Sequence, residues 1–126
     1  MNFKSFNLHP NIESGIKALG YTEPIPIQTQ CIPSILRERD VMGLAQTGTG
    51  KTAAFVLPIL QRLMDGPRKR IRALIIAPTR ELAEQTHESM CQLGRRTKLK
   101  SITIYGGTKK DSQIRMLRKG AEIAVA

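Results

Sequence analysis

Ala45-Gln46-Thr47-Gly48-Thr49-Gly50-Lys51-Thr52 is the stretch that decides the fold of this 126-residue chain. It lies between a short apolar run, residues 40–44, and residues 51–64, where apolar side chains recur at helical spacing. Its glycines allow backbone N–H groups to turn inward around an anion, and the start of the helix adds a positive dipole end. Lys51 can reach the outer phosphates of a nucleotide, and Thr52 can ligate Mg²⁺. The stretch predicts a phosphate-binding loop between a strand and a helix, with a ligand-free glycine-rich turn as the alternative.

Strands and helices alternate outward from this loop, which indicates an α/β fold: a parallel sheet with flanking helices. Residues 73–77 are apolar throughout, as is typical of a strand buried on both faces. The expected helices are 10–19, 27–37 with a new start at Pro33, 51–64, 80–94 with a seam of Leu82, Thr86, Met90 and Leu93, and 111–119; the expected strands are 40–44, 73–77, 101–105 and 122–126, with a turn at Gly106-Gly107.

Composition excludes several classes of protein. The chain has the length of one domain, and no stretch approaches the roughly 18 apolar residues of a membrane span. Its first residues have no secretory pattern, so we expect the cytoplasm. Cys31 and Cys91 have neither metal-ligand spacing nor a disulfide framework, and we expect two packed, reduced thiols.

Charge is concentrated in the second half of the chain. The net charge is +10, and residues 64–126 hold fourteen basic and six acidic side chains. This surplus favours a polyanion such as nucleic acid, with a merely solvated surface as the alternative. An aromatic content of 4% argues against base stacking, so phosphates are the expected contact. We interpret the run Arg68-Lys69-Arg70 as a solvated loop, with a targeting signal as a second interpretation.

Four motifs now carry a resemblance. They are GYTEPIPIQ at residues 20–28, the AQTGTGKT loop at 45–52, PTRELAEQ at 78–85 and the glycine pair at 106–107. In this order they resemble the Q motif, motif I, motif Ia and the GG motif of DEAD-box ATP-dependent RNA helicases, with the bacterial RhlE-type branch favoured. The resemblance implies that residues 1–126 are the front portion of the first RecA-like domain, an incomplete P-loop NTPase domain. Ala45, unusual in a general phosphate loop, is this family's form.

The resemblance also implies which residues bind ATP and RNA. A rigid glutamine amide matches the N6 and N7 edge of adenine and not that of guanine, so Gln28 would select ATP. Tyr21 would pack on the base, with Phe6 supporting the pocket. Thr79 is a natural N-cap, and Arg80 adds charge beside the free N–H groups of that helix. The implied ATP contacts are Phe6, Tyr21, Glu23, Gln28, Ala45, Gln46, Thr47, Gly48, Thr49, Gly50, Lys51 and Thr52, with Lys51 and Thr52 also catalytic and Thr52 holding Mg²⁺; the implied RNA backbone contacts are Pro78, Thr79, Arg80, Gly106 and Gly107.

The family's pattern would continue beyond Ala126 with the carboxylate motif and a second helicase domain. Without them, we expect this stretch to bind ATP without hydrolysing it, and we expect a gap in the sheet beside strand 40–44. The main hypothesis is the ATP- and RNA-binding front of a helicase. The alternatives are a naturally truncated, non-catalytic RNA- or nucleotide-binding module, and an unrelated phosphate-loop kinase or GTPase, in which Gln28 would have no function.

Overall fold

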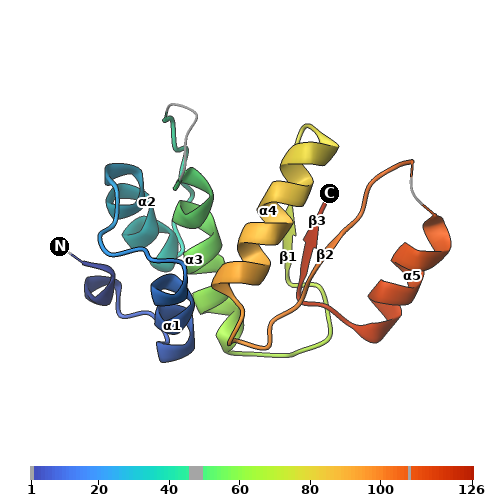
Figure 1. The fold of residues 1–126 in the computed structure, drawn as a ribbon, viewed down its shortest axis with the longest axis horizontal. Helices are drawn as coiled ribbons and strands as arrows, with labels where there is room; N and C mark the ends of the chain where they lie inside the picture. Colours follow the sequence, from blue (N-terminus) through green and yellow to red (C-terminus); the bar gives the residue numbers. More distant parts are fainter. Residues whose placement is uncertain (1, 46–49, 108) are drawn as a thin grey trace.

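The helices and strands follow the predicted order except at residues 40–44, and the strands are shorter than predicted. A computed structural model of the chain describes residues 2–45, 50–107 and 109–126. The predicted phosphate contacts Gln46, Thr47, Gly48 and Thr49 lie outside these described residues. Figure 1 shows a short 3₁₀ helix, Phe3–Phe6, followed by α1 (Pro10–Ala18), α2 (Pro26–Leu36), α3 (Lys51–Met64), β1 (Ala73–Ile75), α4 (Arg80–Leu93), β2 (Ser101–Thr103), α5 (Lys110–Lys119) and β3 (Ile123–Val125).

The described residues form one parallel sheet of three strands in the order β1-β3-β2. Leu74 of β1 and Ile102 of β2 are both in register with Ala124 of the central strand. The last strand of the chain therefore lies between the two earlier ones, which is possible because helical crossovers connect parallel strands. The predicted α/β fold with flanking helices is confirmed.

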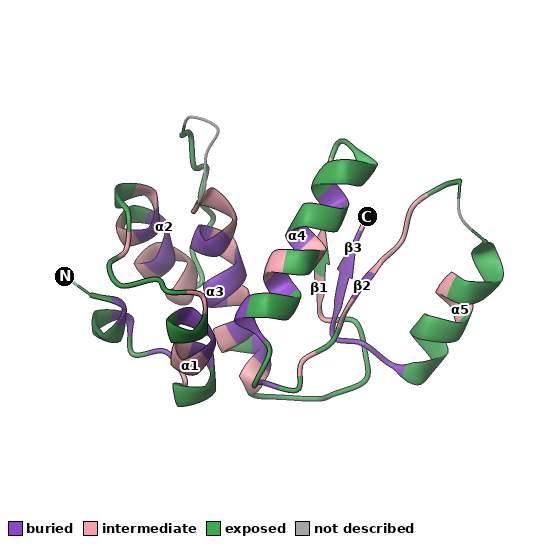
Figure 2. Ribbon diagram, in the orientation of Figure 1, coloured by how far each residue is buried: buried purple, intermediate pink, exposed green. Residues whose placement is uncertain are grey.

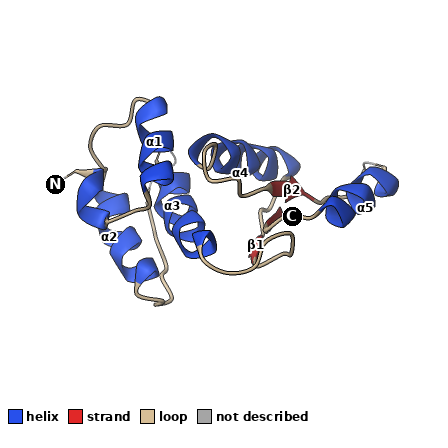
Figure 3. Cartoon of the chain, turned by 90° about the horizontal axis from the view of Figure 1, so that it is seen from below, coloured by secondary structure: helices blue, strands red, loops and turns tan. Residues whose placement is uncertain are grey.

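The main core lies between one face of this sheet and the helices. Ile123 and Val125 point into it and are fully buried, together with Leu57 and Leu60 of α3. In Figure 2 the buried side of α4 faces the same core. Figure 3 shows α1, α2 and α3 gathered on one side of the sheet and α5 beyond β2. The α3 helix is thus packed from Ala53 to Leu63, and this packing fixes the position of its amino end at Lys51.

The opposite face of the sheet is only partly covered, and the prediction that strand 73–77 is buried on both faces is wrong. Leu74 is 62% exposed and Ile76 is 78% exposed. A small second cluster of Ile102 and Ala124 lies on this face near β2, where α5 contacts the sheet. No described element extends this cover to β1, which is an edge strand, so its outward side chains remain in solvent.

Three predicted local features differ in the structure. Residues 40–44 are not a strand: they pair with no described strand, and Met42 and Leu44 are 87% and 86% exposed. The α2 helix runs through Pro33 without a new start, because its packing on α3 outweighs one missing N–H bond. Leu82 is exposed, and Ala83 takes its place in the buried seam of α4.

The two cysteines differ in burial. Cys31 is buried as predicted, whereas Cys91 is exposed, since it lies on the outer side of α4.

Over residues 2–45, 50–107 and 109–126, no group of His, Cys, Asp and Glu is arranged to hold a metal ion. In the same ranges no helix has the length and apolar character needed to cross a bilayer.

Candidate functional site

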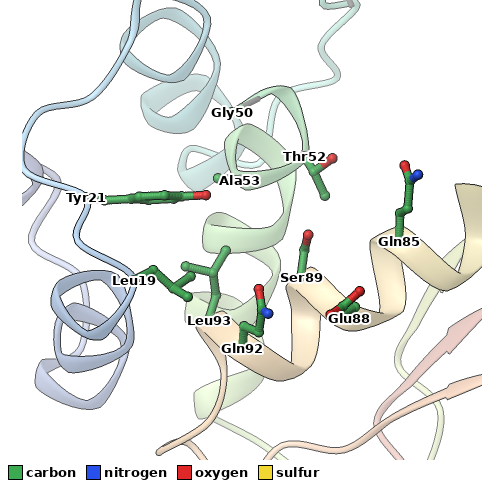
Figure 4. A pocket seen from close by; sticks show the side chains of 10 residues that line it. All are labelled: Leu19, Tyr21, Gly50, Thr52, Ala53, Gln85, Glu88, Ser89, Gln92 and Leu93. Carbon is green, nitrogen blue, oxygen red and sulfur yellow. The ribbon is translucent and has the colours of Figure 1, made fainter. Parts of the chain in front are cut away.

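A cleft of about 560 Å³ opens between the start of α3, the loop after α1 and one side of α4. In Figure 4 the ring of Tyr21 forms one wall, and Thr52 lines the space from the first turn of α3. Polar side chains of α4 form the facing wall, so the cleft is apolar at one end and polar at the other. The residues that line it are Leu19, Tyr21, Gly50, Thr52, Ala53, Gln85, Glu88, Ser89, Gln92 and Leu93.

Gln28 links the loop before α2 to the start of α3. Its side chain is 3% exposed, its Oε1 accepts a hydrogen bond from the backbone N–H of Ile25 at 3.0 Å, and its Nε2 donates to the carbonyl of Gly50 at 3.0 Å. A glutamine amide has two lone pairs and two N–H groups, so one of each is left for a ligand. The two hydrogen bonds to Ile25 and Gly50 hold the amide rigidly, as recognition of a base edge requires.

A smaller hollow of about 100 Å³ lies directly over this amide, lined by Phe3, Tyr21, Glu23, Ile25, Gln28 and Gly50. The rings of Phe3 and Tyr21 are stacked, with centroids 6.4 Å apart and planes 23° apart. Phe6, which the sequence analysis placed beside the pocket, is buried in the core behind Phe3, with 6.0 Å between their centroids. The structure thus brings Tyr21, Glu23, Gln28 and Gly50 together as predicted, and puts Phe3 where Phe6 was expected.

Gly50 is the last residue before α3, and its position demands glycine. Its φ is +105°, and a Cβ there would lie 2.4 Å from Cδ1 of Ile25. Among the described residues no side chain caps this end of α3, so within that part of the chain the N–H groups of the first turn have no side-chain acceptor. An anion at this point would be bound by these N–H groups and by the positive end of the helix dipole.

The remaining predicted phosphate contacts are distributed around this end of α3. Thr52 lines the cleft of Tyr21. Lys51 is half-buried and lines a separate cavity of about 210 Å³, beside Cys31 and Ala54. Ala45 is exposed, and in the sequence it directly precedes the four residues outside the described structure. Lys51 and Thr52 therefore begin on different sides of the same helical turn.

A second group of residues, five of them predicted, meets at the carboxyl ends of β1 and β2; we call it the carboxyl edge (residues 78–80, 84 and 105–107). The hydroxyl of Thr79 accepts a hydrogen bond from the N–H of Leu82 at 3.1 Å and caps α4, as predicted. Arg80 donates from Nη2 to the carbonyl of Gly106 at 2.7 Å. Gly107 has a φ of +86°, and a Cβ on it would lie 2.3 Å from that Nη2. Gly107 thus leaves room for the Arg80 guanidinium, whereas a Cβ on Gly106 would meet nothing within 4 Å.

Tyr105 and Glu84 belong to the same edge, although the sequence analysis assigned them no role. The guanidinium of Arg80 lies over the Tyr105 ring, 4.9 Å from its centroid, and the Tyr105 hydroxyl donates to the Glu84 carboxylate. That hydrogen bond raises the pKa of Tyr105 above its ordinary value. The sequence offered one signal for the role of Glu84: it lies one helical turn after Arg80 on α4, so the two side chains share a face of the helix.

These observations define a class of protein: an α/β domain with a parallel sheet, a cleft at the amino end of one helix and a second polar site at the carboxyl ends of its strands. A sequence profile described as DEAD/DEAH box helicase matches residues 25–126. The chain therefore belongs to the DEAD/DEAH box helicase family.

Relatives extend this finding to nearly the whole chain. The chain is 46% identical to the ATP-dependent RNA helicase DeaD of Escherichia coli (strain K12) over 98% of its own length and 20% of that protein. It is 46% identical to the DEAD-box ATP-dependent RNA helicase CshA of Streptococcus pneumoniae serotype 4, over 99% of its length and 24% of CshA. A crystal structure of the RNA helicase Prp28 from Chaetomium thermophilum bound to ADP superposes with a TM-score of 0.90 at 39% identity, covering 99% of this chain and 31% of Prp28.

The chain thus spans about a fifth to a quarter of the length of these curated helicases. Relatives of similar identity come from Escherichia coli, Streptococcus pneumoniae and the plant Arabidopsis thaliana. The assignment to the RhlE-type branch therefore stays a prediction.

Proposed function

We propose that this chain supplies the ATP-binding cleft and part of the RNA-binding surface of an ATP-dependent RNA helicase. The observation that carries the proposal is the Gln28 side chain, which joins the Q-motif loop to Gly50 at the start of α3. Through it, a group placed to read a base is connected to the helix end that receives phosphates. RNA unwinding is the activity of the longer proteins of this family, and both ATP and RNA are present in the cytoplasm, which we propose as its location.

For the nucleotide, adenine would lie in the hollow over Gln28. The free lone pair and the free N–H of its amide would bind N6 and N7 of the base, and the ring of Tyr21 would pack against it. The phosphates would extend toward Gly50 and the uncapped N–H groups of α3. Lys51, in the same turn, would provide the positive charge nearest to the outer phosphates.

The start of α3 also fits a magnesium ion carried by the nucleotide. Thr52 lines the cleft, and a hydroxyl oxygen is a ligand that Mg²⁺ accepts together with phosphate oxygens and water. When bound, the ion neutralises part of the charge on the phosphates. Thr52 would hold the ion by this one oxygen, and the helix end would hold the phosphates.

For RNA, the carboxyl edge would bind the sugar-phosphate backbone. The first-turn N–H groups of α4, which begins after the Thr79 cap, and the guanidinium of Arg80 are donors suited to phosphate oxygens. The exposed Gly106 and Gly107 would allow a strand to approach the protein backbone closely. Such contacts do not touch base edges, so binding would be independent of RNA sequence.

Calorimetric titration with ADP and GDP tests the nucleotide site. ADP should bind more tightly than GDP by about 1–3 kcal/mol, the value of one good bidentate contact to a base. Gln28→Ala should remove this preference, whereas Gln30→Ala, an exposed residue on the same helix, should keep it. Equal affinities for ADP and GDP in the unaltered chain would exclude an adenine pocket.

Fluorescence anisotropy with labelled RNA tests the carboxyl edge. Arg80→Gln should weaken binding by the same factor for RNAs of different sequence, and the exposed Arg39→Gln should not. A loss confined to one sequence would contradict backbone recognition.

A further inference from the structure

A second charged site lies at the opposite end of the sheet from Arg80 and Gly106. The loops that enter β1, β2 and β3 meet there, at the lower edge of the sheet in Figure 1. They surround a cavity of about 230 Å³. We call this site the basic edge; its cationic residues are Arg68, Lys69, Lys98, Lys100 and Lys119, and its other lining residues are Thr97, Gly120 and Glu122.

Glu122 holds the basic edge together without neutralising it. Its carboxylate is 3% exposed, with Oε2 accepting from the backbone N–H of Lys69 at 2.6 Å and Oε1 accepting from that of Lys100 at 2.7 Å. Both oxygens are therefore used by backbone amides of the loops on either side of β3. Among the described residues none of the five cations takes part in an ion pair, so the site keeps an excess of positive charge.

Two of the lysine backbones are in a conformation that lysine seldom adopts. Lys69 has a φ of +62° and Lys98 a φ of +63°. Lys69 also packs so closely on Gly120 that a Cβ there would lie 2.6 Å from the Lys69 Cβ. A left-handed backbone at a residue other than glycine persists only where the surroundings fix it, and such residues concentrate at functional sites. At Lys69 the Glu122 bond and the Gly120 contact fix it, and both lysines line the same cavity.

Of the five cations of the basic edge, Arg68 alone has side-chain hydrogen bonds to the described residues. Its guanidinium donates to the carbonyl of Thr97 at 3.3 Å and to that of Met64 at 3.4 Å, so it connects the end of α3 to the loop before β2. The four lysines are exposed and end in solvent. A fixed guanidinium surrounded by flexible ammonium groups is suited to a series of phosphates along a chain more than to one enclosed anion.

We propose that the basic edge binds the phosphate backbone of an RNA strand, as a second contact separate from the carboxyl edge. The lining contains no large apolar side chain, whereas a lipid surface is bound by apolar burial together with charge. It contains no aromatic ring on which a base could stack, so recognition is of phosphates and independent of sequence. Because the strands separate the two edges, removing one contact leaves the other in place.

The test removes two lysines whose backbones are not strained. Lys100→Gln with Lys119→Gln is compared with a matched control, Arg37→Gln with Arg39→Gln, two exposed arginines after α2 that line neither edge. The affinity of the 126-residue chain for a labelled uridine oligonucleotide is measured across a range of salt concentrations. Each phosphate contact on a single strand contributes about 0.7 to the slope of log affinity against log salt, so the lysine variant should lose about 1.4 of slope. The control pair should lose less than half of that, and equal losses would overturn the site.

Amide NMR on the unaltered chain gives a readout that needs no variant. Added oligonucleotide should shift the resonances of residues 98–100 and 119–122, and should still do so in Arg80→Gln, which separates this proposal from the carboxyl edge. Inorganic phosphate is the second probe. If phosphate at equal charge concentration shifts these amides as much as the oligonucleotide does, the site is one for small anions and the RNA proposal is wrong. If neither probe shifts them, the basic edge is only a solvated surface.

Discussion

Gln28→Glu is the substitution that separates the structural from the base-reading role of this side chain. The new carboxyl can still accept from the N–H of Ile25, as Oε1 does at 3.0 Å. On the other side, an oxygen replaces the Nε2 that donates to the Gly50 carbonyl at 3.0 Å. Two acceptors then face each other in a site where the side chain is 3% exposed.

The size of the effect follows from these contacts. One neutral hydrogen bond is lost, which costs about 1 kcal/mol, and a buried acceptor without a donor costs about 1–3 kcal/mol more. The free energy of unfolding at neutral pH should therefore fall by about 2–4 kcal/mol. Below the pKa of an unfolded glutamate, about 4.3, the protonated carboxyl donates to Gly50 and most of this loss disappears.

The sign of the pH dependence is fixed by linkage. Burial and the facing carbonyl raise the pKa of the introduced carboxyl in the folded chain, so the folded state binds the proton more tightly than the unfolded state. Stability relative to a control is therefore greatest at low pH and is lost as pH rises through the folded pKa.

Urea unfolding of Gln28→Glu and Gln30→Glu across pH measures this difference. Gln30 is exposed two residues further along α2, so its substitution should change stability by no more than about 0.5 kcal/mol. If the two variants are equally stable at neutral pH, or if their difference does not change with pH, the Gln28 bonds do not hold Gly50.

Three further predictions concern Gly50, Glu122 and Cys91. Gly50→Ala should lower the free energy of unfolding by about 2 kcal/mol or more, because φ is +105° and the new Cβ meets Ile25, while Gly20→Ala, with φ +77° and open space, should lose about half as much in the same urea titration. Glu122→Ala should lower it by about 3 kcal/mol, since two backbone amides lose a charged acceptor, and Glu122→Gln should restore part of the loss. Partial desolvation on α4, followed by the charge of Glu88, raises the pKa of the otherwise exposed Cys91 thiol, so alkylation of the folded chain should reach its maximum rate at higher pH than alkylation of the urea-unfolded chain; identical pH profiles would contradict this desolvation.

Elements that depend on local sequence were predictable, and those that depend on a partner strand were not. The periodicity of residues 51–64 and 80–94 gave two helices to within a residue. Residues 40–44 have the composition of a buried strand, but a strand exists only by pairing, and no described strand pairs with them. The same reason explains Ile76, which is apolar in sequence and exposed in the structure because nothing described covers that face of β1.

In the candidate site, too, contacts between residues close in sequence were predictable, and contacts between distant residues were not. The capping role of Thr79 was predictable because an N-cap bonds to a residue three positions away in sequence. The contact between Arg80 and Gly106 joins residues 26 positions apart, and it follows from the order of the strands rather than from either motif. Phe3 and Phe6 lie one turn apart in a 3₁₀ helix, so which of the two rings faces Tyr21 depends on how that helix packs.

The α4 helix gives the two proposed sites a shared element. It begins at the carboxyl edge, with Thr79 as its cap and Arg80 as its first residue, and its middle turns line the cleft of Tyr21. At 14 residues it spans about 20 Å, and its inner side is packed on α3 and the sheet. Because a packed helix tends to move as a unit, we expect a ligand that displaces Ser89 or Gln92 in the cleft to displace the end that holds Arg80 as well. The connection between the nucleotide cleft and the carboxyl edge therefore requires no pathway through loops; it requires only that α4 have two positions with different contacts at its two ends.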